Sequence, residues 1–91
     1  MKSKIDIEIE AQDTRSDERS AALNWVLNNM DSISEGAPEI SGEIATKDEI
    51  NQYITALRED RKTIPHHSLF GDDNWEQIDT HIEALEWVLE D

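Results

Sequence analysis

The sequence predicts an α+β fold, mainly helical, in which a short two-stranded sheet packs against three helices in the order β-α-β-α-α. Near the N-terminus, isoleucines alternate with acidic residues, and this period of two is typical of a half-buried strand. Farther along, apolar residues recur every three or four positions, which is typical of amphipathic helices. With 91 residues the chain has room for one small domain, so residues 1–91 are expected to share a single core.

The first expected strand covers residues 4–11. Its inner face would carry three β-branched side chains, those of Ile5, Ile7 and Ile9. A short second strand at residues 40–44 would pair with it, because a lone strand cannot satisfy its backbone hydrogen bonds. A second copy of the chain is the alternative partner, and a homodimer would then form through the strand between Lys4 and Ala11.

Three helices are expected from apolar spacing and capping signals. The first covers residues 16–33. The second covers residues 47–62 and begins at a capping box, in which Thr46 is the N-cap and Glu49 lies three residues later. Asp72 or its neighbour would cap the third helix, which runs nearly to the C-terminus and forms an antiparallel hairpin with the second.

The composition argues against several functional classes. Acidic residues number 22 against 8 basic ones, so the formal net charge is −14 and the chain repels nucleic-acid phosphates. We therefore expect no direct binding to nucleic acid. No apolar run approaches the ~18 residues of a membrane span, and no apolar signal sequence is present, so we expect a cytoplasmic protein without membrane contact. There is no cysteine to form a disulfide, a thiolate nucleophile or a zinc ligand.

The negative charge is concentrated after Lys62, where the chain has eight acidic residues and no basic one. At ~100° per residue, six of these acids share one face of the third helix, and an indole side chain projects beside them. Because tryptophan is enriched at binding hot spots, the predicted partner-binding residues are Asp72, Glu76, Asp79, Glu83, Glu86, Glu90 and Trp87. This face either serves only solubility, or it imitates a nucleic-acid backbone and docks in a basic groove. For Trp25 and Trp87, packing against a neighbouring element is the alternative to exposure.

The histidines and carboxylates form no recognisable catalytic or metal-binding pattern. His66 and His67 are adjacent and point apart, whereas a zinc site needs three or four convergent ligands. The sequence also lacks a nucleophile-elbow motif, a phosphate-binding loop and a dinucleotide-binding fingerprint. We therefore expect no enzymatic activity, no metal and no cofactor.

The segment from Ile64 to Leu89 contains S-L-F-G-D-D-N followed by I-D-T-H-I-E-A-L. It resembles the C-terminal part of small uncharacterised accessory proteins encoded by enteric phages and prophages, in which S-x-F-G-x-D-N is followed by I-D-x-x-I-x-x-L. The resemblance implies a phage setting inside the host bacterial cytoplasm. Small acidic proteins in that setting often block host defence or DNA-binding proteins.

The leading hypothesis is a non-enzymatic accessory protein that binds and inhibits a basic, nucleic-acid-handling host protein through the acidic helical face. Its action would be DNA-mimic-like and directed against host defence. The alternative is a small dimeric structural or regulatory interaction module whose acidity serves only solubility.

Overall fold

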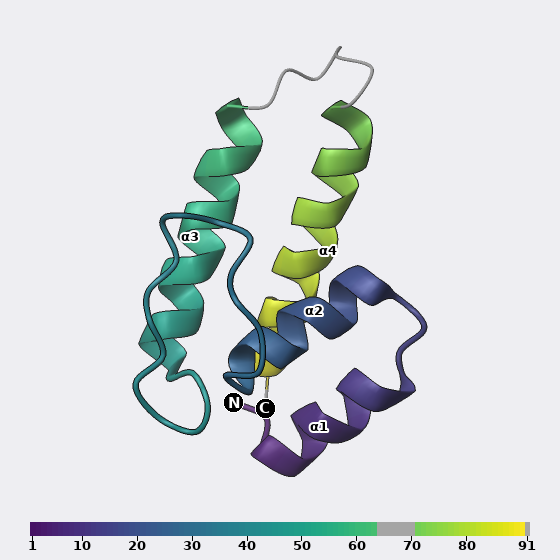
Figure 1. Ribbon diagram of the computed structural model, residues 1–91, viewed down its shortest axis with the longest axis vertical. Helices are drawn as coiled ribbons and strands as arrows, with labels where there is room; N and C mark the ends of the chain where they lie inside the picture. Colours follow the sequence, from purple (N-terminus) through teal and green to yellow (C-terminus); the bar gives the residue numbers. More distant parts are fainter. Residues whose placement is uncertain (64–70, 91) are drawn as a thin grey trace.

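The computed structural model describes residues 1–63 and 71–90, with the side chains of the last helix described from Trp75 onward. The described residues form four helices: α1 (Lys4–Asp13), α2 (Asp17–Val26), α3 (Lys47–Thr63) and α4 (Gly71–Leu89). In Figure 1, α3 and α4 lie side by side and antiparallel, α2 crosses the lower half of α4, and α1 lies below α2. The predicted α+β class is wrong, because the described part of the chain is helical and contains no strand.

The first predicted strand is the helix α1. Ser3 caps it, because its Oγ accepts a hydrogen bond from the Asp6 backbone N–H at 3.2 Å. A helix satisfies its backbone within its own segment, so residues 4–11 need no partner strand. The strand edge through which a homodimer was expected to form is therefore absent from this segment.

Of the three isoleucines in α1, Ile5 and Ile9 lie on one side of the helix and Ile7 lies on the other. Residues four apart share a helical face, whereas residues two apart lie about 200° apart. Ile7 is accordingly fully buried against the core, while Ile5 is 68% exposed and Ile9 is 53% exposed. The isoleucines do alternate with acidic residues, but in the helix only Ile7 packs into the core.

The helix α2 ends seven residues earlier than predicted. Ser16 caps its start by accepting from the Arg19 backbone N–H at 3.2 Å. Its end is marked by Asn28, whose φ of 60° is in the left-handed region that asparagine tolerates better than most residues. Met30 and Ile33, counted in the predicted apolar stripe, lie beyond this point and are half-exposed.

Residues 27–46 connect α2 to α3 without a helix or a strand, so the second predicted strand at residues 40–44 is also wrong. Because residues 4–11 form a helix, residues 40–44 have no strand there with which to pair. The connection instead runs across the front of α3 in Figure 1. It closes where the Ala45 N–H donates to the Val26 carbonyl at 2.7 Å.

The start of α3 matches its predicted capping box. The Thr46 N–H donates to Glu49 Oε1 at 2.8 Å, and the Glu49 N–H donates back to Thr46 Oγ1 at 3.2 Å. The apolar faces of α3 and α4 then close the core together with α2. Its largest fully buried side chains are those of Tyr53, Ile7, Leu23, Ile50, Leu57, Leu85, Val26 and Val88.

An aromatic cluster lies at the centre of this core. The rings of Trp25 and Tyr53 meet edge to face, with centroids 4.2 Å apart, and the His81 ring is stacked near Tyr53 with centroids 6.4 Å apart. His81 is 3% exposed, and its Nδ1–H donates to the Gln77 carbonyl at 3.0 Å. Burial lowers the pKa of His81, against the opposing effects of this hydrogen bond and of the Glu18 charge.

Because His81 is buried and its pKa is lowered, we expect the free energy of unfolding to fall in mild acid. The unfolded chain binds a proton at His81 near pH 6.5, whereas the folded chain binds it only at lower pH. The stabilising contribution is therefore complete above about pH 6.5 and is lost as the pH falls through the lower pKa of the folded state. In urea titrations at pH 7.5 and 5.5, we expect the wild type to lose more stability than His81→Phe, which keeps an aromatic ring. Parallel losses in both proteins would contradict this role.

Candidate functional site

The predicted acidic face of α4 is present over the residues that the structure describes. Glu76 and Glu83 are exposed on it, Asp79 and Glu86 lie along one side of it, and the exposed Glu90 follows directly after the last helical residue, Leu89. The side chain of Asp72, the sixth predicted acid, lies outside the described residues. A helix places these positions together because steps of three, four and seven residues return to one side of its axis.

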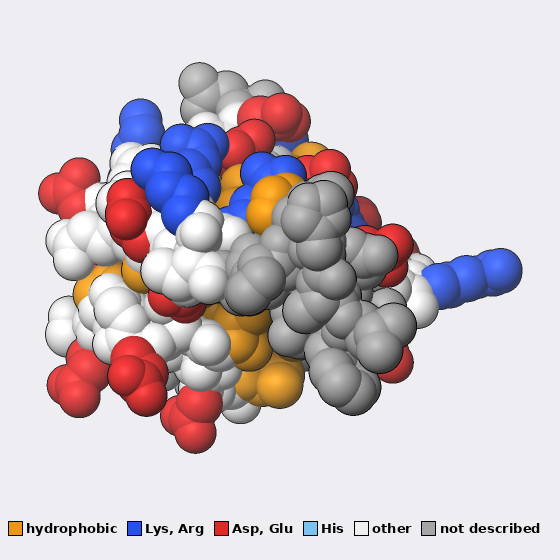
Figure 2. Space-filling view, turned by 90° about the horizontal axis from the view of Figure 1, so that it is seen from above, with side chains coloured by type: hydrophobic (Ala, Val, Ile, Leu, Met, Phe, Trp, Pro, Cys, Tyr) orange, Lys and Arg blue, Asp and Glu red, His pale blue; other side chains and the backbone are white. Residues whose placement is uncertain are grey.

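Two of the five described acids are neutralised by arginines of α3. Arg58 Nη2 lies 3.0 Å from Glu86 Oε1, and Arg61 Nε lies 3.1 Å from Asp79 Oδ1. Figure 2 looks down on the end of the molecule where α3 ends and α4 begins, and it shows Lys and Arg side chains gathered beside acidic ones. These two ion pairs were not predicted, because helical periodicity describes α4 alone; the spacing of three residues between Arg58 and Arg61 on the other helix of an antiparallel hairpin was a usable signal.

The remaining three acids form what we call the acidic row, consisting of Glu76, Glu83 and Glu90. Each is exposed, and among the described residues no Lys or Arg forms an ion pair with any of them. Their spacing of seven residues corresponds to about 10.5 Å along the helix, at ~1.5 Å per residue. Duplex DNA carries one charge per ~1.7 Å of its axis, so the acidic row is a much sparser array than a nucleic-acid backbone.

A groove of about 640 Å³ lies between α3 and α4 beside the acidic row. Trp75 and Ile82 supply its apolar surface, and the Arg61 guanidinium lies over the Trp75 ring, 4.4 Å from its centroid. Glu83 borders the groove, as do both ion pairs to α3. The groove therefore presents both signs of charge, and the surplus of negative charge comes from the acidic row.

The two tryptophans discussed from the sequence are both engaged within the molecule. Trp25 is 3% exposed and packs on Tyr53, so packing explains it. Trp87 is partly buried against the core, with Lys2 Nζ 5.2 Å and the Arg19 guanidinium 5.4 Å from its ring centroid. These cations occupy surface that a partner would need, so a role of Trp87 in partner binding stays a prediction.

The cover over Trp87 comes from the N-terminal part of the chain. The Lys2 N–H donates to the Val88 carbonyl at 2.7 Å, which fastens the N-terminus to the end of α4. Arg19 is held in place by Glu10, whose Oε1 lies 3.1 Å from Arg19 Nε. Figure 1 shows the start of the chain close to the end of α4.

Comparison with known proteins adds no further assignment to this surface. The chain matches no family model, no curated protein and no solved structure. The resemblance of residues 64–89 to phage accessory proteins therefore stays a prediction.

The described side chains also bear on metal binding and membrane insertion. Within residues 1–63 and the described side chains of α4, no group of three or more His, Asp or Glu residues is placed to hold a metal ion. His66 and His67 lie outside this part of the chain. None of the described helices is both long enough and apolar enough to cross a membrane.

Proposed function

We propose that this chain is a small non-enzymatic binding protein that docks on a basic partner protein through the acidic row of α4. The observation that carries the proposal is that Glu76 and Glu83 on α4, and Glu90 directly after it, are exposed and form no ion pair with a described Lys or Arg, while α3 neutralises two acids beside them. Unpaired charges on one face attract a complementary surface, and they raise association rate and specificity more than affinity. The formal net charge of −14 also attracts a basic partner at long range.

The partner class follows from this charge. A protein that handles nucleic acid carries a basic surface to contact phosphates. Covering that surface with the acidic row would block access of nucleic acid, so binding would inhibit the partner. The sparse spacing of the row supports docking between separate basic side chains rather than imitation of each phosphate in turn.

The test compares two triple variants that remove the same charge. Replacing Glu76, Glu83 and Glu90 with glutamine removes the acidic row. Replacing Glu8, Asp13 and Glu35 with the matching amides removes three exposed acids elsewhere. Each immobilised protein is incubated with bacterial lysate at low and high salt, captured proteins are identified by mass spectrometry, and the affinity of the most enriched basic protein is measured.

We expect the acidic-row variant to bind that protein about tenfold more weakly, which corresponds to about 0.5 kcal/mol for each exposed charge. The control variant should stay within about twofold. Arg58→Gln with Arg61→Gln should strengthen capture, because it releases Glu86 and Asp79 from their ion pairs. Equal weakening in both triple variants would show that only bulk charge matters. A salt-insensitive homodimer in light scattering, with no basic protein captured, would instead support the interaction-module alternative.

A further inference from the structure

The side of α1 that faces away from the core carries two large apolar side chains. Ile5 is 68% exposed and Ile9 is 53% exposed, and they lie one turn apart, whereas Ile7 on the opposite side is fully buried. They are two of the four large hydrophobic residues that are exposed in the described part of the chain. Isoleucine is a poorer helix former than alanine, and an exposed isoleucine gains little burial in return. The stability of α1 therefore does not explain either residue.

Acidic residues flank this apolar pair on both sides of the helix. At ~100° per residue, Glu8 lies roughly 80° to one side of the line between the two isoleucines, and Asp6 and Asp13 lie roughly 60–80° to the other side. All three acids are exposed, and none forms an ion pair with a described Lys or Arg. We call this surface the α1 outer face, and it consists of Ile5, Ile9, Asp6, Glu8 and Asp13.

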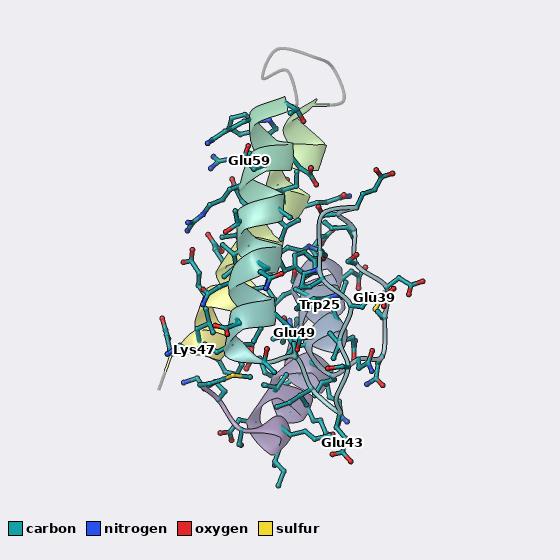
Figure 3. The ribbon with its side chains drawn as sticks, turned by 90° about the vertical axis from the view of Figure 1, so that its left-hand side faces the viewer. Trp25, Glu39, Glu43, Lys47, Glu49 and Glu59 are labelled. Atoms are coloured by element: carbon teal, nitrogen blue, oxygen red, sulfur yellow. The ribbon has the colours of Figure 1, made fainter. Side chains whose placement is uncertain are left out.

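The rest of the described chain leaves the α1 outer face open. The helix packs on α2 through its other side, where Ile7 joins the core. Lys4 is the only basic residue of α1, and it is already paired, because its Nζ lies 3.6 Å from Glu43 Oε2. Figure 3 shows Glu43 on the connection between α2 and α3, where this connection passes beside α1. The face is thus apolar along its centre and negative along both edges.

Charge complementarity decides between a second copy of the chain and a different partner on this face. A two-fold axis would place the α1 outer face of one copy against the same face of the other. Because both edges are acidic, carboxylates would oppose carboxylates whichever way the axis runs, and two chains of formal charge −14 also repel each other at long range. Two isoleucines also fall far short of the ~800 Å² per partner of a standard stable interface. The occupant must instead bring positive charge on both sides of an apolar stripe.

We infer that the α1 outer face docks an amphipathic basic helix of a partner protein, whose apolar stripe covers Ile5 and Ile9 and whose lysines or arginines lie along the acidic edges. Such a helix has apolar residues at spacings of three and four, with basic residues on both flanks. The isoleucines supply the contact that excludes water, whereas the acids select the sign of the partner and raise the association rate. Amides at Glu8 and Asp13 should therefore change the affinity by only about twofold. The inference goes beyond the proposed function, because no residue of the α1 outer face belongs to the acidic row.

The test is a two-dimensional NMR titration of the full chain with a synthetic 14-residue peptide of leucine and lysine, in which leucine recurs every three or four positions. One control peptide has the same composition in an order that forms no apolar stripe, and a second has glutamate in place of lysine. We expect saturable shifts of the α1 amides with the first peptide, at roughly 0.1 mM affinity, and no saturable shift of them with either control. Equal shifts with the control of scrambled order, or shifts confined to α4, would overturn the inference. Concentration-dependent shifts of the α1 amides without peptide would also overturn it, since a second copy would then be the occupant.

Two double variants of equal net charge then locate the contact. Ile5→Ala with Ile9→Ala should weaken peptide binding about tenfold, because it removes the apolar side chains that the peptide covers. Met30→Ala with Ile33→Ala removes the other two exposed large hydrophobic residues, which lie outside α1, and should bind within about twofold of the wild type. Circular dichroism checks that both variants keep the helical content of the wild type. Equal weakening in the two variants would refute a contact at α1.

Discussion

Replacing Ile7 with alanine is expected to lower the free energy of unfolding by about 2–4 kcal/mol, because the substitution leaves a cavity in a well-packed core. Ile7 is fully buried between α1 and the rest of the molecule. Small domains have about 5–15 kcal/mol of stability in total, so this loss is a large fraction of it. Urea unfolding followed by far-ultraviolet circular dichroism measures the change.

The matched controls are Ile5→Ala and Ile9→Ala on the opposite side of α1. Both isoleucines are more than half exposed, and alanine is the better helix former, so each change should alter stability by less than about 0.5 kcal/mol. A strand over residues 4–11 would put all three isoleucines on one face and make the three losses equal. Three equal losses would therefore contradict the helix α1, whereas one large loss and two small changes would support it.

Replacing Tyr53 with phenylalanine is expected to cost about 1–2 kcal/mol and to loosen the connection between α2 and α3. The ring would keep its place against Trp25 and His81, but the Ile33 N–H would lose the acceptor that now lies 3.1 Å away. Burial raises the pKa of Tyr53, so the hydroxyl stays neutral and available as an acceptor through the physiological range.

Hydrogen exchange separates this local effect from a general loss of stability. In Tyr53→Phe, the Ile33 amide should exchange faster than the change in global stability explains. Thr55→Val is the control, because it removes a hydroxyl from the same helix whose hydrogen bond, to the Asn51 carbonyl, stays within α3. Unchanged protection of the Ile33 amide in Tyr53→Phe would show that this hydrogen bond does not hold the connection.

The parts of the fold that local sequence predicts well are those with a capping signal and a long apolar stripe. The capping box at Thr46 and Glu49 marks the start of α3, and both of its hydrogen bonds are present. The predicted third helix is present as α4. The prediction of a strand at residues 4–11 was wrong. The alternation of isoleucines with acids suits a strand, but a strand needs a partner strand to satisfy its backbone hydrogen bonds, whereas a helix does not. The predicted end of α2 was wrong because the spacing of apolar residues does not reveal that Asn28 has a left-handed backbone conformation.

For the acidic row, too, one part could be predicted from local sequence and another depends on tertiary contacts. Helical spacing alone puts Glu76 and Glu83 on one face of α4, since that depends only on the period of the helix, whereas Glu90 comes directly after the helix ends at Leu89. Which acids remain unpaired depends on Arg58 and Arg61, which belong to α3 and reach α4 only across the hairpin. The cavity bordered by Trp25, Asp31 and Glu39 likewise arises from residues of α2 and of both ends of the connection between α2 and α3.

The excess of acidic residues, its concentration after Lys62 and the helical period that aligns these acids follow from the amino-acid sequence alone. Which isoleucine of α1 is buried, the position of Trp87 beneath Lys2 and Arg19, and the pairing of Glu86 and Asp79 with described arginines all depend on the tertiary structure. The physical reason is that charge and periodicity are properties of a segment. Burial and ion pairing are properties of the segments brought together by the core, and their free energies depend on neighbours distant in the chain.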